Sequence, residues 1–298
     1  MSQNIYIYYE FFKREFLSNL LLSVIASKKN FNVYIGTNKA FNVLHKKKLI
    51  SPGIFHTKSL SHGIEKSQFH KNLKKNNFII TSIDQEHGLT NKGNFDDLFI
   101  KPRIHPDDLN LCSAYFCWGK FDFKKLTRKF KKKIFYLTGS PRVDLWKVKF
   151  DRVWKNKNLL KKKYILFVSH FVFTNNFYTF RQIIERKEKE NYYKRSPNLK
   201  KEDVKYYNYQ KQSMKKFTNL IIKFSKKFPD EIIYVRPHPT EKVEYWIDNL
   251  KNCKNVFIRE KGDLSSYIRN AECVIQDGCT SAMESYISDV PVISYLSN

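Results

Sequence analysis

The chain lacks any hydrophobic run long enough to cross a membrane. Its 298 residues contain no stretch of about 18 apolar residues, the length that a transmembrane helix requires. The amino terminus, Met1-Ser2-Gln3-Asn4, leads directly into a strand-like segment rather than into the basic and then apolar regions of a signal peptide. We therefore expect a cytoplasmic protein without a membrane-spanning helix.

Paired cysteines and several signature motifs are also missing. The five cysteines form no CxxC pair and leave an odd thiol under any pairing, which favours a reducing compartment and argues against structural zinc. There is no GxGxxG fingerprint, no zinc-finger spacing, no RNP signature and no helix-turn-helix pattern. These absences argue against a standard dinucleotide enzyme and against a specific nucleic-acid module.

Acidic residues are scarce relative to basic ones. The 55 Lys and Arg against 28 Asp and Glu give a formal net charge of +27. This excess favours anionic partners, such as an acidic substrate or nucleic acid. The protein would also contact the anionic inner membrane peripherally. An AT-rich genome also enriches lysine and asparagine without selection for binding, and both explanations stay open.

Strand-like and helix-like segments alternate along the whole chain. β-Branched and aromatic runs predict strands, and apolar residues at helical spacing from Leu17 to Ile25 predict an amphipathic helix between the first two. This β-α-β order indicates a parallel α/β sheet with helices on its faces. The predicted strands are 4–9, 32–35, 78–83, 114–117, 134–137, 164–168, 232–235, 273–275 and 291–295.

The length and the pattern predict two domains of about 150 residues each. We expect an amino-terminal domain at 1–145, a lysine-rich linker at 146–163 and a carboxyl-terminal domain at 164–298. Residues 174–211 form a charged, tyrosine-rich insertion without a clear core face, which is interpreted as an exposed excursion, a lid or an acceptor loop. A helix is expected from about Gln212 to Phe228.

Two polar turns follow predicted strands of the carboxyl half. Arg236-Pro237-His238-Pro239 cannot continue a strand, because its two prolines remove backbone donors and force an extended turn. Gly278 permits a second tight turn, after which Thr280 and Ser281 begin a predicted helix. Open α/β sheets bind ligands at the carboxyl ends of their strands, so the two turns predict walls of a phosphate or nucleotide site.

These motifs resemble bacterial surface-carbohydrate biosynthesis proteins, which are glycosyltransferase-like proteins of the GT-B fold with two Rossmann-like domains facing a cleft. The matching segments are 13–15, 84–88, 118–119, 138–144, 236–239, 280–284 and 291–295. The chain is also similar to capsular Kdo transferases and polysialyltransferases, which use CMP-activated sugars. The Arg-Pro-His-Pro element occurs in CDP-glycerol polymerases as well, so it indicates the superfamily better than the substrate.

The resemblance implies a donor site on the carboxyl half. His238 would donate a hydrogen bond to a phosphate of the nucleotide sugar, or it only closes its own turn. Arg236 would add positive charge to this site, or its side chain points away and pairs with a carboxylate. Ser169 and His170 end another strand and would contact the phosphates or simply begin a loop. Gly278, Thr280 and Ser281 would bind phosphate, or the two hydroxyls would only cap a helix. Glu284 would hold ribose or complete a capping box with Ser281.

The same resemblance implies an acceptor site on the amino half. An acceptor hydroxyl needs a proton acceptor in an inverting transfer, and Asp84, Glu86 and His87 follow a predicted strand. The related acidic-acidic-Gly motif differs here, because histidine precedes Gly88, which leaves the base open among the three. We expect Glu86 to be the base; Asp84 alternatively caps the next helix.

The sequence therefore predicts a metal-independent GT-B glycosyltransferase of surface polysaccharide or capsule synthesis, without a cofactor. It would transfer a sugar from a nucleotide donor, CMP-linked in preference to UDP- or CDP-linked, to a glycan or lipid-linked acceptor. The alternatives are a sugar-nucleotide epimerase, a CDP-glycerol-type glycerophosphotransferase and a non-catalytic glycan- or nucleic-acid-binding protein. The chain ends three residues after Tyr295, where GT-B proteins usually continue with a helix, so a shortened chain or a different closure is expected.

Overall fold

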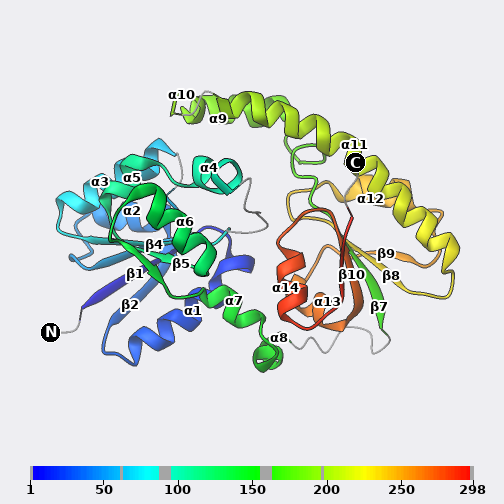
Figure 1. The fold of residues 1–298 in the computed structure, drawn as a ribbon, viewed down its shortest axis with the longest axis horizontal. Helices are drawn as coiled ribbons and strands as arrows, with labels where there is room; N and C mark the ends of the chain where they lie inside the picture. The colour runs from blue at the N-terminus through cyan, green and yellow to red at the C-terminus, as the bar shows by residue number, and fades with distance from the viewer. Residues whose placement is uncertain (1–2, 61–62, 87–94, 155–162, 196–197, 296–298) are drawn as a thin grey trace. The chain divides into compact units, whose positions relative to one another are not determined.

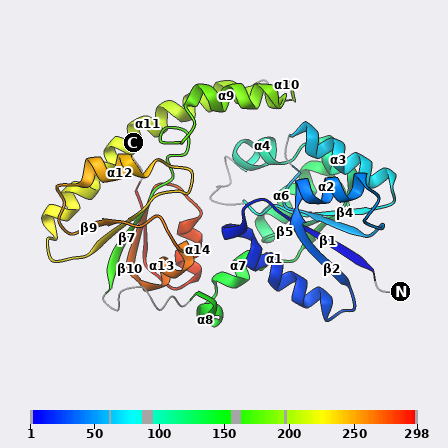
Figure 2. The ribbon, with the colours of Figure 1, turned by 180° about the vertical axis from the view of Figure 1, so that it is seen from behind.

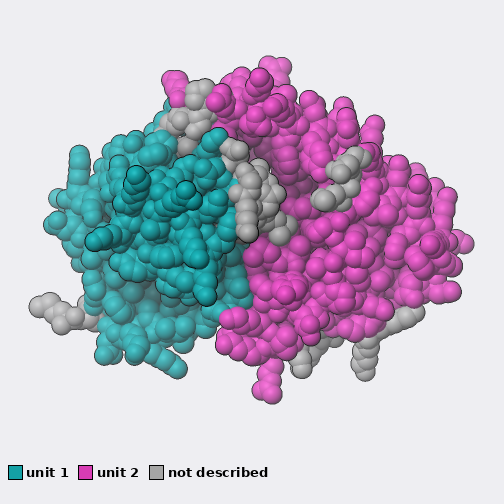
Figure 3. All heavy atoms as spheres, viewed as in Figure 1, with its two compact units in different colours: residues 1–145, 190–192 teal, residues 146–189, 193–298 magenta. Residues whose placement is uncertain are grey.

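The computed structural model describes residues 3–60, 63–86, 95–154, 163–195 and 198–295. The chain divides into two compact units, residues 1–145 with 190–192 and residues 146–189 with 193–298 (Figure 3). Each unit is a parallel sheet with helices on its faces (Figures 1 and 2). Within the described ranges, every helix is too short or too polar to span a bilayer.

The amino-terminal unit contains a six-stranded sheet in the order β2-β1-β3-β4-β5-β6, with every neighbouring pair parallel. Its strands are β1 (Asn4–Tyr9), β2 (Asn32–Thr37), β3 (Ile54–Thr57), β4 (Ile79–Ile83), β5 (Cys112–Cys117) and β6 (Phe135–Leu137). Its helices are α1 (Phe12–Ser27), α2 (Asn38–Lys46), α3 (Ile64–Lys75), the π-helix η1 (Asp96–Ile100), α4 (Lys101–Arg103), α5 (Pro106–Leu111), α6 (Lys120–Phe130) and α7 (Pro141–Trp146), whose last residue belongs to the other unit.

Strand alternation explains how this sheet acquires its core. Tyr6, Phe55 and Ile80 point to one face, where they pack with Phe41 of α2 and Phe69 of α3. The burial of these large aromatic side chains removes apolar area from water, which is the main stabilising contribution. The opposite strand residues face α1.

The carboxyl-terminal unit contains a five-stranded parallel sheet in the order β11-β10-β7-β8-β9. Its strands are β7 (Tyr164–Val168), β8 (Ile233–Arg236), β9 (Val256–Ile258), β10 (Ala271–Gln276) and β11 (Val292–Ser294). Its helical segments are the 3₁₀ turn η2 (Val148–Phe150), α8 (Asp151–Trp154), α9 (Phe180–Lys189), α10 (Tyr192–Arg195), α11 (Asn198–Lys227), α12 (Val243–Leu250), α13 (Leu264–Asn270) and α14 (Ser281–Ile287). Phe217 of α11 and Trp246 of α12 cover one face, and Tyr267 and Ile268 of α13 cover the other.

The fold class is as predicted, and the predicted strands form within one or two residues of their expected bounds. Sequence reasoning missed β3, a four-residue strand that follows Pro52-Gly53. A Cβ on Gly53 would lie 2.4 Å from the carbonyl oxygen of Asn4, so only glycine lets this strand approach β1 so closely. Sequence reasoning also missed β9, the three-residue strand Val256–Ile258.

The described part of the segment 174–211 is mostly exposed or half-buried, as predicted, and much of it is helical. α11 begins at Asn198 rather than near Gln212, and α9 precedes it. The side chain of Gln210 is buried and bonds the main chain of the β7–α9 loop at Phe173 N and His170 O, at 2.9 and 2.8 Å. Aromatic side chains hold the two helices together: Phe180 of α9 stacks on Tyr207 of α11, with ring centroids 4.2 Å apart. The described part of the predicted linker, 146–154, packs on α13 through a 2.7 Å Asp151–Arg269 ion pair.

Candidate functional site

A network of charged side chains lies where β1, β3 and β4 of the amino-terminal unit end. Because these strands are parallel neighbours, their carboxyl ends meet at one edge of the sheet. Glu86 there accepts bonds from Arg14, Lys58 and Arg103 at 2.5, 2.9 and 2.8 Å. Asp84 accepts from Arg103 at 2.7 Å and from the Glu86 amide at 2.8 Å.

Glu15 anchors the same network from α1. Its carboxylate is fully buried and binds Arg14 at 2.9 Å, Lys58 at 3.3 Å and the Glu10 amide at 2.7 Å. Lys58 also pairs with Glu10. Burial alone would raise the pKa of Glu15, but Lys58 and Arg14 outweigh this effect and lower that pKa below its ordinary value. Sequence reasoning noted Arg14 and Glu15 only within a matching segment and missed Lys58, because β3 itself was missed.

The electrostatics of Glu86 bear on its predicted role as the base. Burial would raise the pKa of Glu86, but Arg103, Arg14 and Lys58 together lower it far below its ordinary value. In this arrangement Glu86 holds three cations and binds a proton weakly, so proton abstraction would require at least one cation to leave. Asp84 likewise binds an arginine, and His87 lies outside the described residues. The identity of the base stays a prediction.

In the carboxyl-terminal unit, the strand register brings the two predicted histidines together. Val168 of β7 pairs with Arg236 of β8, so His170 and His238 both lie two residues beyond that pair. Their rings approach edge to face, with centroids 5.2 Å apart and planes at 80°. Both side chains are half-buried. The sheet edge thus presents two imidazoles side by side.

The hydrogen bonds of His238 indicate which ring nitrogen carries its proton. The Thr240 amide donates to Nδ1 at 3.3 Å, and the Thr240 hydroxyl lies 2.9 Å from the same nitrogen. A nitrogen that accepts from an amide is unprotonated, so neutral His238 carries its proton on Nε2. The histidine is held by its own turn, as one alternative expected, and that contact orients Nε2–H as a donor.

Glu241 organises this edge and was missed by sequence reasoning. Its carboxylate is 1% exposed and accepts bonds from Ser169 Oγ, the Phe171 amide and Trp246 Nε1, each at 2.9 Å in its shortest contact. The His238 amide donates to it at 3.3 Å. Glu241 therefore ties the β7 loop to the histidine turn. The available signal was its position two residues after Pro239, next to a turn whose amides need an acceptor.

Arg236 is directed into the protein rather than held by a carboxylate. Its guanidinium donates to the carbonyl oxygens of Arg259, Lys261 and Gly262 at 2.8, 2.8 and 2.6 Å, and it lies over the Tyr267 ring. The side chain is buried. These contacts fix the loop after β9, whose Gly262 has a φ of +85° that strains any other residue.

Replacing Arg236 distinguishes loop anchoring from phosphate binding. Lysine keeps the charge but cannot reach three carbonyls with a planar fork, so we expect Arg236→Lys to lower the free energy of unfolding by about 1–3 kcal/mol. Urea unfolding checks this value, with Arg259→Lys as the control. Unchanged stability combined with weaker nucleotide binding would contradict the anchoring role.

The Gly278 turn lies beside the histidines, because β10 is the other neighbour of β7. Gly278 has a φ of +65°, as its predicted tight turn requires. The helix after it, α14, begins at Ser281 with Thr280 as N-cap, and the Thr280 side chain makes no cap bond. The predicted capping box needed Ser281 at that position. Glu284 is buried and accepts a bond from the Ser265 hydroxyl of α13.

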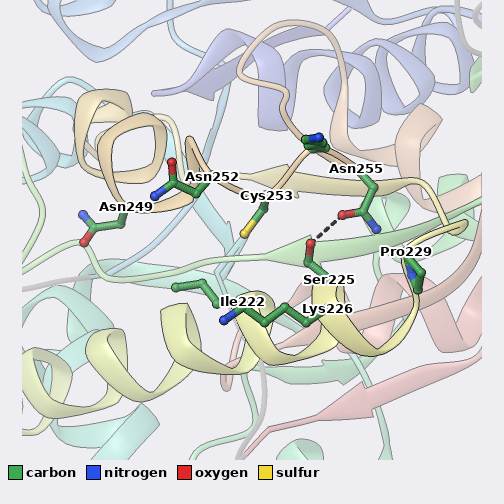
Figure 4. Close-up of a pocket in the computed structure, with 9 residues that line it drawn as sticks. Ile222, Ser225, Lys226, Pro229, Asn249, Asn252, Cys253 and Asn255 are labelled. Atoms are coloured by element: carbon green, nitrogen blue, oxygen red, sulfur yellow. Dashed lines mark hydrogen bonds between the residues drawn. The ribbon is translucent and has the colours of Figure 1, made fainter.

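A hollow of about 390 Å³ also lies on the carboxyl-terminal unit, between the end of α11 and the segment that leads into β9 (Figure 4). Ser225 donates to Asn255 across it. Pro229 and Asn255 precede β8 and β9, so this hollow lies at the amino ends of the strands, opposite the edge where parallel sheets bind ligands. We assign it no role.

The amino-terminal unit has an apolar pocket of about 390 Å³ on the sheet face under α1. Its walls include Ile7, Ile83 and Phe116, with His56 among them. Burial lowers the pKa of His56 to about 4, so this histidine is neutral at pH 7. None of the predicted site residues lines the pocket. Across the described ranges, no three His, Cys, Asp or Glu residues gather as metal ligands do.

Comparison with known proteins defines the architecture. No family model and no curated protein matches the chain. Among solved structures, a putative UDP-N-acetylglucosamine 2-epimerase from Listeria monocytogenes aligns with a TM-score of 0.59 at 10% identity, covering 100% of this chain and 80% of that one. The wall teichoic acid polymerase TagF aligns with a TM-score of 0.51 at 12% identity, over 98% and 69%. The chain therefore has the two-domain α/β fold of GT-B type.

Proposed function

We propose that the protein is a GT-B-type glycosyltransferase that binds a nucleotide-sugar donor on its carboxyl-terminal unit. The observation that carries this proposal is the pair of imidazoles, His170 and His238, at the carboxyl ends of adjacent parallel strands. This is the edge at which open α/β sheets bind ligands. The fold it shares with the epimerase and with TagF supports the proposal at the level of architecture.

The chemistry of this edge suits a leaving phosphate. When a glycosidic bond to a phosphate oxygen breaks, negative charge develops on the phosphate, and preorganised donors stabilise it. His238 offers Nε2–H without needing to ionise, because its Nδ1 already accepts from Thr240. Glu241 fixes the turn of His238, so the Nε2–H group is already in position when the nucleotide sugar binds.

The remaining assignments follow the sequence resemblance. CMP-linked donors are the first class to test, and the amino-terminal unit would bind a glycan or lipid-linked acceptor with Asp84, Glu86 or His87 as its base. The basic surface would allow peripheral contact with an anionic membrane. Arg236 is assigned to its loop instead of to the donor, since three carbonyls occupy its guanidinium.

Two substitutions at His238 test the donor role. Asparagine places an oxygen near the position of Nδ1 and keeps the acceptor for Thr240, whereas glutamine reaches further and keeps a donor near the position of Nε2. The ligand is whichever of CMP, CDP, UDP and GDP stabilises the wild type. We expect His238→Asn to lower its affinity by roughly tenfold or more, and His238→Gln to lower it less. Thermal shift and titration calorimetry measure both.

His45 on α2 provides the control, because it is a half-buried histidine of the other unit. His45→Asn should leave nucleotide affinity unchanged. Equal affinity in wild type and His238→Asn would contradict the proposal. Conversion of a nucleotide sugar without any acceptor would identify an epimerase instead.

A further inference from the structure

Asp277 lies at the same sheet edge as the two histidines. Gln276, the last residue of β10, pairs with Val168 of β7, so Asp277 is level with Ser169. Neighbouring strands are about 4.8 Å apart, which places the Asp277 main chain one strand away from the β7 loop and two from the His238 turn. Nothing in the proposed function uses this carboxylate.

The environment of Asp277 is unusual for an acidic side chain in this protein. It is half-buried, and within the described residues its carboxylate makes no hydrogen bond and no ion pair. By contrast, both carboxylate oxygens of Glu241, at the same edge, accept hydrogen bonds. A carboxylate held partly out of water without a partner costs free energy, and burial raises its pKa to about 6. Packing alone does not account for such a residue.

An aromatic side chain of α11 lies on the β7 loop, which neighbours the strand that ends at Asp277. Tyr206 is in the first half of α11, where Gln210 bonds this loop at Phe173 N and His170 O. The Tyr206 ring is 40% exposed and packs edge to face on Phe173 of the β7 loop, with centroids 5.6 Å apart. The helix of the insertion therefore brings an open aromatic face to the strand ends.

A carboxylate beside an aromatic face selects one kind of ligand. A carboxylate only accepts hydrogen bonds, and it repels a phosphate, so it fits hydroxyl groups rather than the phosphate itself. An exposed ring packs on the apolar face of another ring. A sugar or ribose ring next to the phosphate offers both features, since each carries hydroxyl donors around a flat ring.

We propose that Asp277 and Tyr206 form a subsite for the hydroxyl-bearing ring attached to the donor phosphate. This inference rests on the proposed function, and it assigns the ring contact to residues other than Glu284, whose buried carboxylate accepts from Ser265. Asp277 accepts from ring hydroxyls while Tyr206 covers the ring. The ring is either the ribose of the nucleotide or the transferred sugar, and the experiment distinguishes these two sources.

Titration calorimetry on the full chain tests the subsite. The probes are CMP and UMP, each beside its 2′,3′-dideoxy form, with CMP-N-acetylneuraminate and UDP-N-acetylglucosamine as sugar-bearing ligands. We expect Asp277→Asn, which is isosteric, to weaken binding of a hydroxyl-bearing probe roughly tenfold or more. If the ribose is recognised, the wild type prefers the ribonucleotide and the variant loses that preference. If the sugar is recognised, only the sugar-bearing probes lose affinity.

A second pair of variants examines the aromatic contact. Tyr206→Ala should weaken binding of the same probe, whereas Tyr136→Ala, at a comparably exposed tyrosine of β6 in the other unit, should not. Unchanged or tighter binding in Asp277→Asn would overturn the subsite while leaving the donor proposal intact. A wild type that binds none of the nucleotides or nucleotide sugars would overturn both.

Discussion

Replacing Glu241 by alanine is expected to destabilise the carboxyl-terminal unit by about 3–5 kcal/mol. The substitution leaves the Ser169 hydroxyl, the Phe171 amide and the Trp246 indole N–H without their acceptor in a buried place. Each buried donor without a partner costs about 1–3 kcal/mol, less what water entering the cavity recovers. The His170 loop and the His238 turn should lose their fixed spacing at the same time.

Urea unfolding, followed by hydrogen exchange in peptides of each unit, measures this loss. Glu241→Gln is the matched variant, because its amide keeps one acceptor oxygen but turns a second donor toward Trp246. Its stability should lie between those of the wild type and the alanine variant. The amino-terminal unit provides the internal reference. A loss below about 1 kcal/mol in Glu241→Ala would show that water replaces the carboxylate and would contradict its organising role.

Replacing Glu15 by alanine should have an effect of similar size on the amino-terminal unit, about 3–5 kcal/mol at pH 7. The carboxylate is fully buried, and its removal leaves Arg14 and Lys58 with one anion fewer. Breaking a buried ion pair from one side costs more than the pair contributes, because Arg14 and Lys58 stay largely buried with less compensating charge, although both still bind Glu86. Exposed Glu65 on α3 is the control, and Glu65→Ala should change stability by less than about 0.5 kcal/mol.

The effect of Glu15 should depend on pH in a defined direction. Its pKa is lower in the folded chain than the ordinary value of 4.5, so its contribution is present above that value. The contribution is lost as the pH falls through the folded-state pKa, and Glu86 behaves in the same way. The difference between wild type and Glu15→Ala should therefore shrink as unfolding is measured at successively lower pH. A difference independent of pH would contradict the electrostatic origin.

The sequence predicted the sheets better than it predicted the sites. Runs such as Ile232–Val235 identify buried parallel strands because both faces of the sheet need apolar side chains. β3 could not be predicted by the same rule, since its four residues follow Pro52-Gly53 and include His56. Because β3 was missed, Lys58, which follows this strand, was not predicted as a site residue, although Lys58 binds both Glu15 and Glu86.

At the candidate donor site, residue types were predicted better than their contacts. The prolines of the Arg-Pro-His-Pro segment correctly indicated that the strand ends in a turn, and the register then places His238 beside His170. The partners of Arg236 lie 23 to 26 residues away in sequence, and Glu241 binds Ser169 and Phe171 at separations of 72 and 70 residues, so no local pattern specifies these contacts. The first half of α11 is exposed, as predicted, but the pairing of Tyr206 and Tyr207 with Phe173 and Phe180 was not predicted, because no local pattern specifies it.

The central claim is that the nucleotide binds at the carboxyl ends of β7, β8 and β10. The most direct test is hydrogen exchange of the wild type, with and without saturating CMP and, separately, UDP. We expect slower exchange in peptides that cover 168–176, 236–242 and 276–281, and no change in peptides of the six-stranded sheet. Protection confined to other segments, or no protection with either nucleotide, would contradict a donor site at this edge.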